Sequence, residues 1–207
     1  MPLADYQAEV KKEKRAAILE AAQAAFLAKG FARTSVNTIA KDAGVSTATL
    51  YKHFDTKEDL FGAVTGQMWR ALRSRLDLQT LNDTPLAEAL QLIGTEYAEL
   101  LMREDVRGLF RVIIAEAVQF PELGQKLYEH GKEAYLQKLE RYLTQQVNAG
   151  ELKIGDVSLA TRQFLGMISE VVFFPSLLVA ELAVSDKERD EAVRGAVETF
   201  LAHYLAG

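Results

Sequence analysis

Apolar residues recur every three or four positions along this chain, and no stretch alternates convincingly between apolar and polar residues. The first spacing places apolar side chains on one face of an α-helix, whereas a half-buried strand requires the alternation. Gly and Pro fall between the helical runs rather than in clusters, so we expect no long linker. The pattern predicts an all-α protein of about nine helices.

Residues 31–57 have the spacing of two short helices joined by a tight turn. If Ser35 caps the first helix, Ala40 is its fifth position, which must be small because the second helix packs against it. Gly44 is the ninth position and can adopt the positive φ that the turn needs. The second helix then begins after Ser46. This pattern predicts a helix-turn-helix whose second helix enters a DNA major groove.

The second of these helices begins with unusually short exposed side chains. Thr47 and Thr49 offer a hydroxyl and a methyl group to a base edge, and Ala48 adds apolar contact without bulk. The longer side chains that follow can reach phosphate oxygens at the flanks. In the alternative interpretation, residues 47–49 only begin a helix at positions that accept many residue types, and Tyr51 belongs to the core. The DNA-binding residues that this pattern predicts are Thr47, Ala48, Thr49, Tyr51, Lys52, His53 and Lys57.

Charge is distributed unevenly along the chain. Residues 1–57 hold nine Lys or Arg against six Asp or Glu, although the whole chain has a net charge of -5. A basic end on an acidic body orients a protein toward a polyanion even when its total charge is negative. The basic excess of residues 1–57 therefore favours a nucleic-acid partner for this end of the chain.

Several classes of chemistry are disfavoured by the composition. Cysteine is absent and the three histidines lie far apart, so we predict no disulfide and no metal site. A Gly-rich phosphate loop, GxSxG and HExxH are all missing, so we predict neither an enzyme nor a cofactor. The longest apolar stretch, residues 171–180, is half the roughly 20 residues of a membrane span, and the N-terminus does not resemble a secretory signal. We therefore expect a cytoplasmic protein without a membrane segment.

The DNA-binding region of the tetracycline-repressor (TetR) family closely resembles residues 18–64, ILEAAQAAFLAKGFARTSVNTIAKDAGVSTATLYKHFDTKEDLFGAV. The resemblance implies a homodimeric bacterial transcription regulator, most often a repressor, that binds a palindromic operator on double-stranded DNA. The resemblance also implies a phosphate contact by Ser35. A small apolar or amphipathic effector in the C-terminal domain would release the operator. The implied domains are a three-helix DNA-binding domain, residues 1–55, and a helical ligand-binding and dimerisation domain, residues 56–207. Parts of the C-terminal domain are similar to the AefR-like subgroup.

The C-terminal part is rich in aromatic and Met residues. These residues could line an apolar cavity, or they could form an ordinary core. Tyr128, Tyr135 and Tyr142 recur every seven residues and would share one helix face, lining either a pocket or the core. Glu116 falls inside an apolar arc and needs a partner, either Arg141 or Arg162 or a cationic ligand. The predicted effector-binding residues are Met68, Tyr97, Phe110, Ile113, Glu116, Ala117, Tyr135, Phe164 and Met167.

The last two predicted helices, residues 156–182 and 185–205, have the apolar faces of a dimer interface. A helix that is apolar nearly all round needs cover on both sides, and a second copy can supply one of them. We expect homodimerisation through residues 158–206, including a stripe of Val197 and Phe200, and a kink at Pro175. The alternatives are an internal hairpin in a monomer and a helical lipophile carrier that does not bind DNA.

Overall fold

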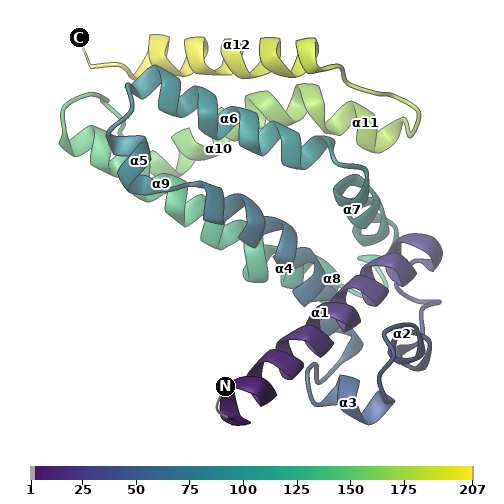
Figure 1. Cartoon of the computed structure of the whole chain (residues 1–207). Helices are drawn as coiled ribbons and strands as arrows, with labels where there is room; N and C mark the ends of the chain where they lie inside the picture. Colours follow the sequence, from purple (N-terminus) through teal and green to yellow (C-terminus); the bar gives the residue numbers. More distant parts are fainter. Residues whose placement is uncertain (1–2, 207) are drawn as a thin grey trace. The chain divides into compact units, whose positions relative to one another are not determined.

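The computed structural model describes residues 3–206, which form helices joined by short connections (Figure 1). Apart from one isolated antiparallel bridge between Leu152 and Leu205, the described residues contain no β-structure, so the all-α prediction is confirmed. Two compact units divide the chain: unit 1 comprises residues up to Gln67 with Gly108–His130, and unit 2 comprises Met68–Arg107 and residues from Gly131 onward. The sequence-based domain boundary near residue 55 differs from this division and stays a prediction.

Most helices lie within one unit. Unit 1 contains α1 (Leu3–Lys29), α2 (Val36–Asp42), α3 (Thr47–Tyr51) and α8 (Glu122–Leu127). Unit 2 contains α5 (Leu78–Asn82), α6 (Leu86–Met102), α9 (Glu133–Asn148), α10 (Val157–Val172), α11 (Phe174–Leu178) and α12 (Asp186–Tyr204). Residues of both units occur in α4 (Lys57–Arg75), α7 (Glu104–Glu116) and the π-helical turn η1 (Tyr128–Lys132).

The core of unit 1 is a cluster of phenylalanine rings. Phe26 on α1 packs against Phe31 and Phe61, with ring centroids 5.7 and 5.2 Å apart. Phe120 adds a fourth ring, 5.1 Å from that of Phe31. Each such pair contributes about 0.5–1.5 kcal/mol beyond its buried area. The cluster therefore holds α1, α4 and the chain around Phe120 together.

Helices α6, α10 and α12 pack together in unit 2 (Figure 1). Phe164 and Phe200 are fully buried and contact each other, with centroids 5.4 Å apart. Gly94 lets α6 approach α12, since a Cβ there would lie 2.6 Å from Val193 Cγ1. The stripe of Val197 and Phe200 expected at the dimer interface thus packs inside its own chain. Its assignment to a partner was wrong because sequence periodicity does not say what covers a buried face.

Two helices predicted as continuous are interrupted. The residues around Pro175 break the helix into α10 and α11 rather than kinking it, because proline supplies no N–H for the Val171 carbonyl. Ser176 donates its hydroxyl to the Phe173 carbonyl at this break. Between α8 and α9, the π-helical turn η1 widens the helix, so the seven-residue tyrosine pattern loses its common face. Tyr128 is 41% exposed, whereas Tyr135 is fully buried.

Candidate DNA-binding and effector sites

The helix-turn-helix in unit 1 is fixed by local capping. The side chain of Ser35 accepts from the N–H of Thr38 at 3.1 Å and begins α2. Gly44 has a φ of +67°, as the turn requires. Ser46 then caps α3 by accepting from the N–H of Thr49 at 3.1 Å. These short-range contacts explain why the sequence pattern identified both helices.

The leading residues of α3 are accessible but their hydroxyls are paired within the chain. Ala48 and Tyr51 are exposed, and Tyr51 retains 48% of its accessible surface. The hydroxyl of Thr47 donates to Asn37 Oδ1 at 3.0 Å, and that of Thr49 lies 2.8 Å from Ser46 Oγ. The interpretation of Tyr51 as a core residue is therefore wrong. Asn37, on which the sequence pattern carries no signal, lies on α2 and binds the predicted groove contact Thr47.

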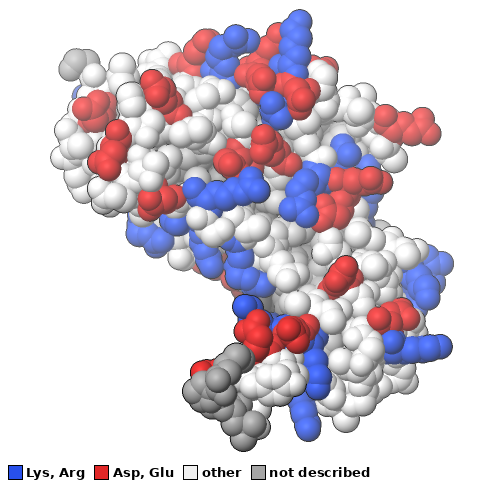
Figure 2. Space-filling view, viewed as in Figure 1, with Lys and Arg blue, Asp and Glu red and all other residues white. Residues whose placement is uncertain are grey.

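Basic side chains of α1 act on the residues that follow α3. Arg15 Nη1 donates to the carbonyl of His53 at 3.3 Å, and its guanidinium carbon lies 4.3 Å from the centre of the Phe54 ring. Partial burial, followed by the charges of Arg15, Lys11 and Lys14, lowers the pKa of His53 below 6.5. In Figure 2, Lys and Arg side chains project from the part of the molecule that contains α1–α3. The sequence signal for Lys11, Lys14 and Arg15 was the run of basic residues at positions 11–15.

The turn between α1 and α2 is held by two charged side chains of unit 1. One carboxylate oxygen of Glu116 accepts from the N–H of Phe31 at 2.7 Å, and the other accepts from the N–H of Ala32 at 2.6 Å. Lys57 Nζ donates to the carbonyls of Phe31 and Thr34, at 2.8 and 3.0 Å. We call this arrangement the turn clamp. Burial lowers the pKa of Lys57, and the nearby carboxylates of Glu58 and Glu116 oppose that shift.

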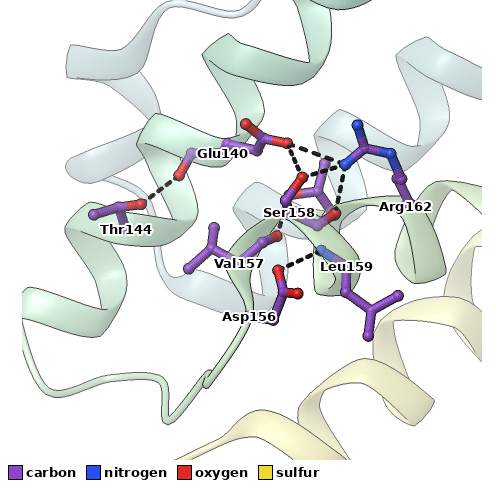
Figure 3. A network of polar contacts seen from close by, with 8 residues as sticks. Glu140, Thr144, Asp156, Val157, Ser158, Leu159 and Arg162 are labelled. Atoms are coloured by element: carbon purple, nitrogen blue, oxygen red, sulfur yellow. Dashed lines mark hydrogen bonds and ion pairs between the residues drawn. The ribbon is translucent and has the colours of Figure 1, made fainter.

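The clamp corrects the expected partner of Glu116. Its carboxylate binds backbone N–H groups rather than an arginine or a cationic ligand. In unit 2, Arg162 instead contacts Glu140 and Ser158 (Figure 3). The error arose because helical spacing places Glu116 in an apolar arc but carries no information about a turn so distant in sequence. The phosphate contact predicted for Lys57 stays a prediction.

The predicted effector residues are divided between the two units. Unit 2 brings Tyr97 against Tyr135, with the rings stacked at 5.9 Å, and Phe164 lies in the same unit, where it packs on Phe200. Met68, Ile113 and Phe164 are buried, and Phe110, Glu116, Ala117 and Met167 are partly exposed. Phe110, Ile113, Glu116 and Ala117 belong to unit 1, and the other five belong to unit 2.

A cavity of about 200 Å³ lies between α4 and α6 in unit 2. None of the residues predicted to bind an effector lines it. Its walls carry both signs of charge, including an ion pair between Arg75 and Glu96. The residues lining it are Ala71, Leu72, Arg75, Glu96, Glu99, Leu100 and Arg103.

Two capped helices with short exposed side chains leading the second are the features of a DNA-binding regulator. Residues 18–64 match the bacterial regulatory proteins of the tetR family. Residues 88–206 match the C-terminal domain of AefR-like transcriptional repressors. The chain therefore belongs to the TetR family of transcriptional regulators and has an AefR-like C-terminal domain.

Relatives of known structure have the same architecture throughout. A TetR-family transcriptional regulator of Mesorhizobium loti is 32% identical with a TM-score of 0.82, over 94% of this chain and 98% of that one. The flavonoid-responsive regulator FrrA is 28% identical with a TM-score of 0.77, over 93% and 97%. The fatty acid metabolism regulator protein of Bacillus subtilis is 29% identical over 78% of this chain and 83% of its own. These relatives are regulators rather than enzymes. Among the described residues, no helix is long and apolar enough to span a membrane.

Proposed function

We propose that this protein is a cytoplasmic, ligand-responsive repressor that binds a palindromic operator as a homodimer. The observation that carries the proposal is α3, on which Ala48 and Tyr51 are exposed beside Thr47 and Thr49. A helix with these short side chains can approach the floor of a major groove closely. The AefR-like match over residues 88–206 supports repression as the direction of control.

The basic start of α1 extends the proposed DNA surface. Lys11, Lys14 and Arg15 are close enough to His53 to act on its pKa, and His53 directly follows Lys52 after α3. Side chains at the flank of a recognition helix commonly bind phosphate oxygens and set its register without reading bases. We assign phosphate contacts to these cations, in addition to Tyr51 and Lys52.

An exposed apolar face in unit 2 supports homodimerisation. Val171 and Phe174 are 46% and 49% exposed, and Leu178 on α11 is 71% exposed. Gly195 on α12 has open space around the position of a Cβ, which permits a close approach of another helix. A second copy covering this face through α10–α12 would remove the apolar surface from water. Dimerisation would also let two α3 helices reach half-sites about 34–36 Å apart.

The effector is proposed to be a small apolar or amphipathic molecule. FrrA is flavonoid-responsive, and the Bacillus subtilis relative is named for fatty acid metabolism, so an aromatic and a fatty effector are both candidates. The effector would act by preferring a conformation with a different spacing of the two α3 helices. Operator and effector must then weaken each other by the same factor, typically corresponding to about 1–3 kcal/mol.

Operator binding by the purified protein tests the proposed function. Fluorescence anisotropy would measure binding to labelled DNA from upstream of its own gene at several salt concentrations. We expect specific binding with a strong salt dependence, and we expect Thr49→Val to change which operator bases are tolerated by about 1–3 kcal/mol. A protein that binds lipophiles but shows no preference for any of this DNA would instead be the carrier considered above. Candidate effectors would be titrated with and without operator, and equal affinities would contradict the coupling.

A further inference from the structure

A hydrogen bond between side chains joins the two helices of the helix-turn-helix. The hydroxyl of Thr47, the first residue of α3, donates to Oδ1 of Asn37 on α2 at 3.0 Å. Ten residues separate the two in sequence, so the contact forms because α2 and α3 pack together (Figure 1). Asn37 is exposed and Thr47 is partly exposed. The pair therefore lies at the surface, at the end of α3 that a recognition helix turns toward the base edges.

The backbone that carries this pair is held in place. Ser35 caps α2 and Ser46 caps α3, each through a hydrogen bond to a backbone N–H three residues later. Each helix also has a buried apolar side chain, Ile39 on α2 with no exposed surface and Leu50 on α3 with 1%. The two polar side chains are thus positioned before DNA binds, which is what a precise binding site requires.

The hydrogen bond determines what the pair can still offer to DNA. A threonine hydroxyl has one proton, and Thr47 donates it to Asn37, so its oxygen can only accept from a base. The amide of Asn37 is held through its oxygen, and its NH2 group keeps two protons to donate. The pair therefore presents one donor, Asn37 Nδ2, beside one acceptor, Thr47 Oγ1.

Adenine is the base whose edge matches this pair. In the major groove, adenine offers an acceptor, N7, beside a donor, its N6 amino group. Guanine offers two acceptors, cytosine one donor, and thymine one acceptor with a methyl group. A guanine would place its O6 against the Thr47 oxygen, and two acceptors facing each other disfavour that base. Among single bases, only adenine satisfies both members of the pair.

The residue types of the pair also favour base reading over phosphate binding. Asn37 is the single Asn or Gln among residues 31–57, and an amide is the side chain that commonly pairs with adenine. Neither Asn37 nor Thr47 is charged, so the pair releases no counterions from DNA. Its contribution should therefore appear as a base preference rather than as salt dependence.

We propose that Asn37 and Thr47 together read one adenine in each operator half-site. Asn37 Nδ2 donates to N7 of the base, and Thr47 Oγ1 accepts from its N6 amino group. This inference rests on the proposed function, since it names a base that the regulator selects. Asn37 is then a specificity-determining residue on α2, outside the recognition helix.

The test replaces single atoms of the operator. Substitution of each base in turn locates the positions at which the wild type prefers adenine. At such a position, 7-deazaadenine lacks N7, and unsubstituted purine lacks the N6 amino group. We expect each analogue to weaken wild-type binding about three- to tenfold in anisotropy titrations. At one position, 7-deazaadenine should not weaken Asn37→Ala, and unsubstituted purine should not weaken Thr47→Val.

Asn148→Ala is the matched control, because it removes the same amide from an exposed position at the end of α9 in unit 2. Its affinity for every operator should equal that of the wild type. Asn37→Ala should keep the wild-type slope of log affinity against log salt, since no charge is lost. Circular dichroism should show that both variants keep the helix content of the wild type.

Two results would overturn the inference. In the first, 7-deazaadenine weakens Asn37→Ala as much as the wild type at every adenine position, so that Asn37 does not read N7. In the second, Asn37→Ala weakens binding to all sequences alike, as loss of a phosphate contact does. A wild-type protein without any sequence preference would instead contradict the proposed function itself.

Discussion

Glu116 and Lys57 hold opposite sides of the same turn: the carboxylate accepts from its N–H groups, and the ammonium donates to its carbonyls. The turn connects α1 to α2 and lies directly before Ser35, the cap of the helix-turn-helix. Gly30 makes room for the carboxylate, since a Cβ there would lie 2.5 Å from Glu116 Oε1. Two charged side chains therefore fix the turn that leads into α2, the first helix of the helix-turn-helix.

Glu116→Gln should destabilise the turn clamp. The amide keeps one oxygen acceptor but replaces the other with a donor, so one of the two backbone N–H groups loses its partner. We expect the free energy of unfolding to fall by about 1–3 kcal/mol, measured by urea denaturation. Glu20→Gln is the control, because it also removes one carboxylate of unit 1, from an exposed position. Equal stability of Glu116→Gln and wild type would contradict the clamp.

Lys57→Met should weaken operator binding without changing its salt dependence. Methionine keeps an apolar chain against the Phe31 ring, over which Nζ lies at 4.2 Å, but loses the bonds to the carbonyls. We expect lower affinity because the turn before α2 is less ordered. A plot of log affinity against log salt would be decisive. A slope reduced by about 0.9 would show that Lys57 binds a phosphate, as the sequence predicted.

Lys14→Ala should reduce the salt dependence of operator binding, and Lys12→Ala should not. Lys14 acts on His53 near the end of α3, whereas Lys12 is paired with Glu9 at 3.7 Å. Loss of one phosphate contact lowers the slope of log affinity against log salt by about 0.9. Both variants remove one positive charge from α1, so they differ only in the position of the lost charge. Identical slopes for both would remove α1 from the DNA surface.

Operator binding should strengthen as the pH falls from about 8 to 6. The pKa of His53 is lowered below 6.5 in the free protein, so its ring is mostly neutral at pH 7. A phosphate beside it would raise that pKa, and binding would then take up a proton. The same lowered pKa makes the free protein less stable below pH 6.5, because the unfolded chain binds the proton more readily.

His53→Gln should flatten the pH dependence of operator affinity while keeping a neutral side chain of similar size. Anisotropy titrations at matched ionic strength would measure the effect, with Lys52→Gln as a control that removes a charge but no titration in this range. A pH dependence that survived in His53→Gln would have to come from another group.

Val171→Glu should produce a folded monomer. Val171 is 46% exposed, so glutamate is tolerated within the subunit but would be buried against an apolar partner surface. Light scattering would measure the mass, and circular dichroism would confirm folding. Leu92→Glu on α6 is the control, since Leu92 is 52% exposed and lies outside α10–α12. Val197→Glu should unfold the protein instead, because Val197 is buried. A Val171→Glu variant that stayed dimeric would place the interface elsewhere.

The sequence by itself determined the helices of the DNA-binding part. Ser35 and Ser46 cap their helices through hydrogen bonds to backbone N–H groups three residues later, and Gly44 adopts the positive φ of the turn. These interactions are local, so they do not depend on the rest of the fold. The tertiary structure decided which side chains meet across long separations. It paired Glu116 with a turn 84 and 85 residues earlier, and it placed Phe200 inside its own subunit. Helical periodicity identifies a face that must be covered, but only packing selects the surface that covers it.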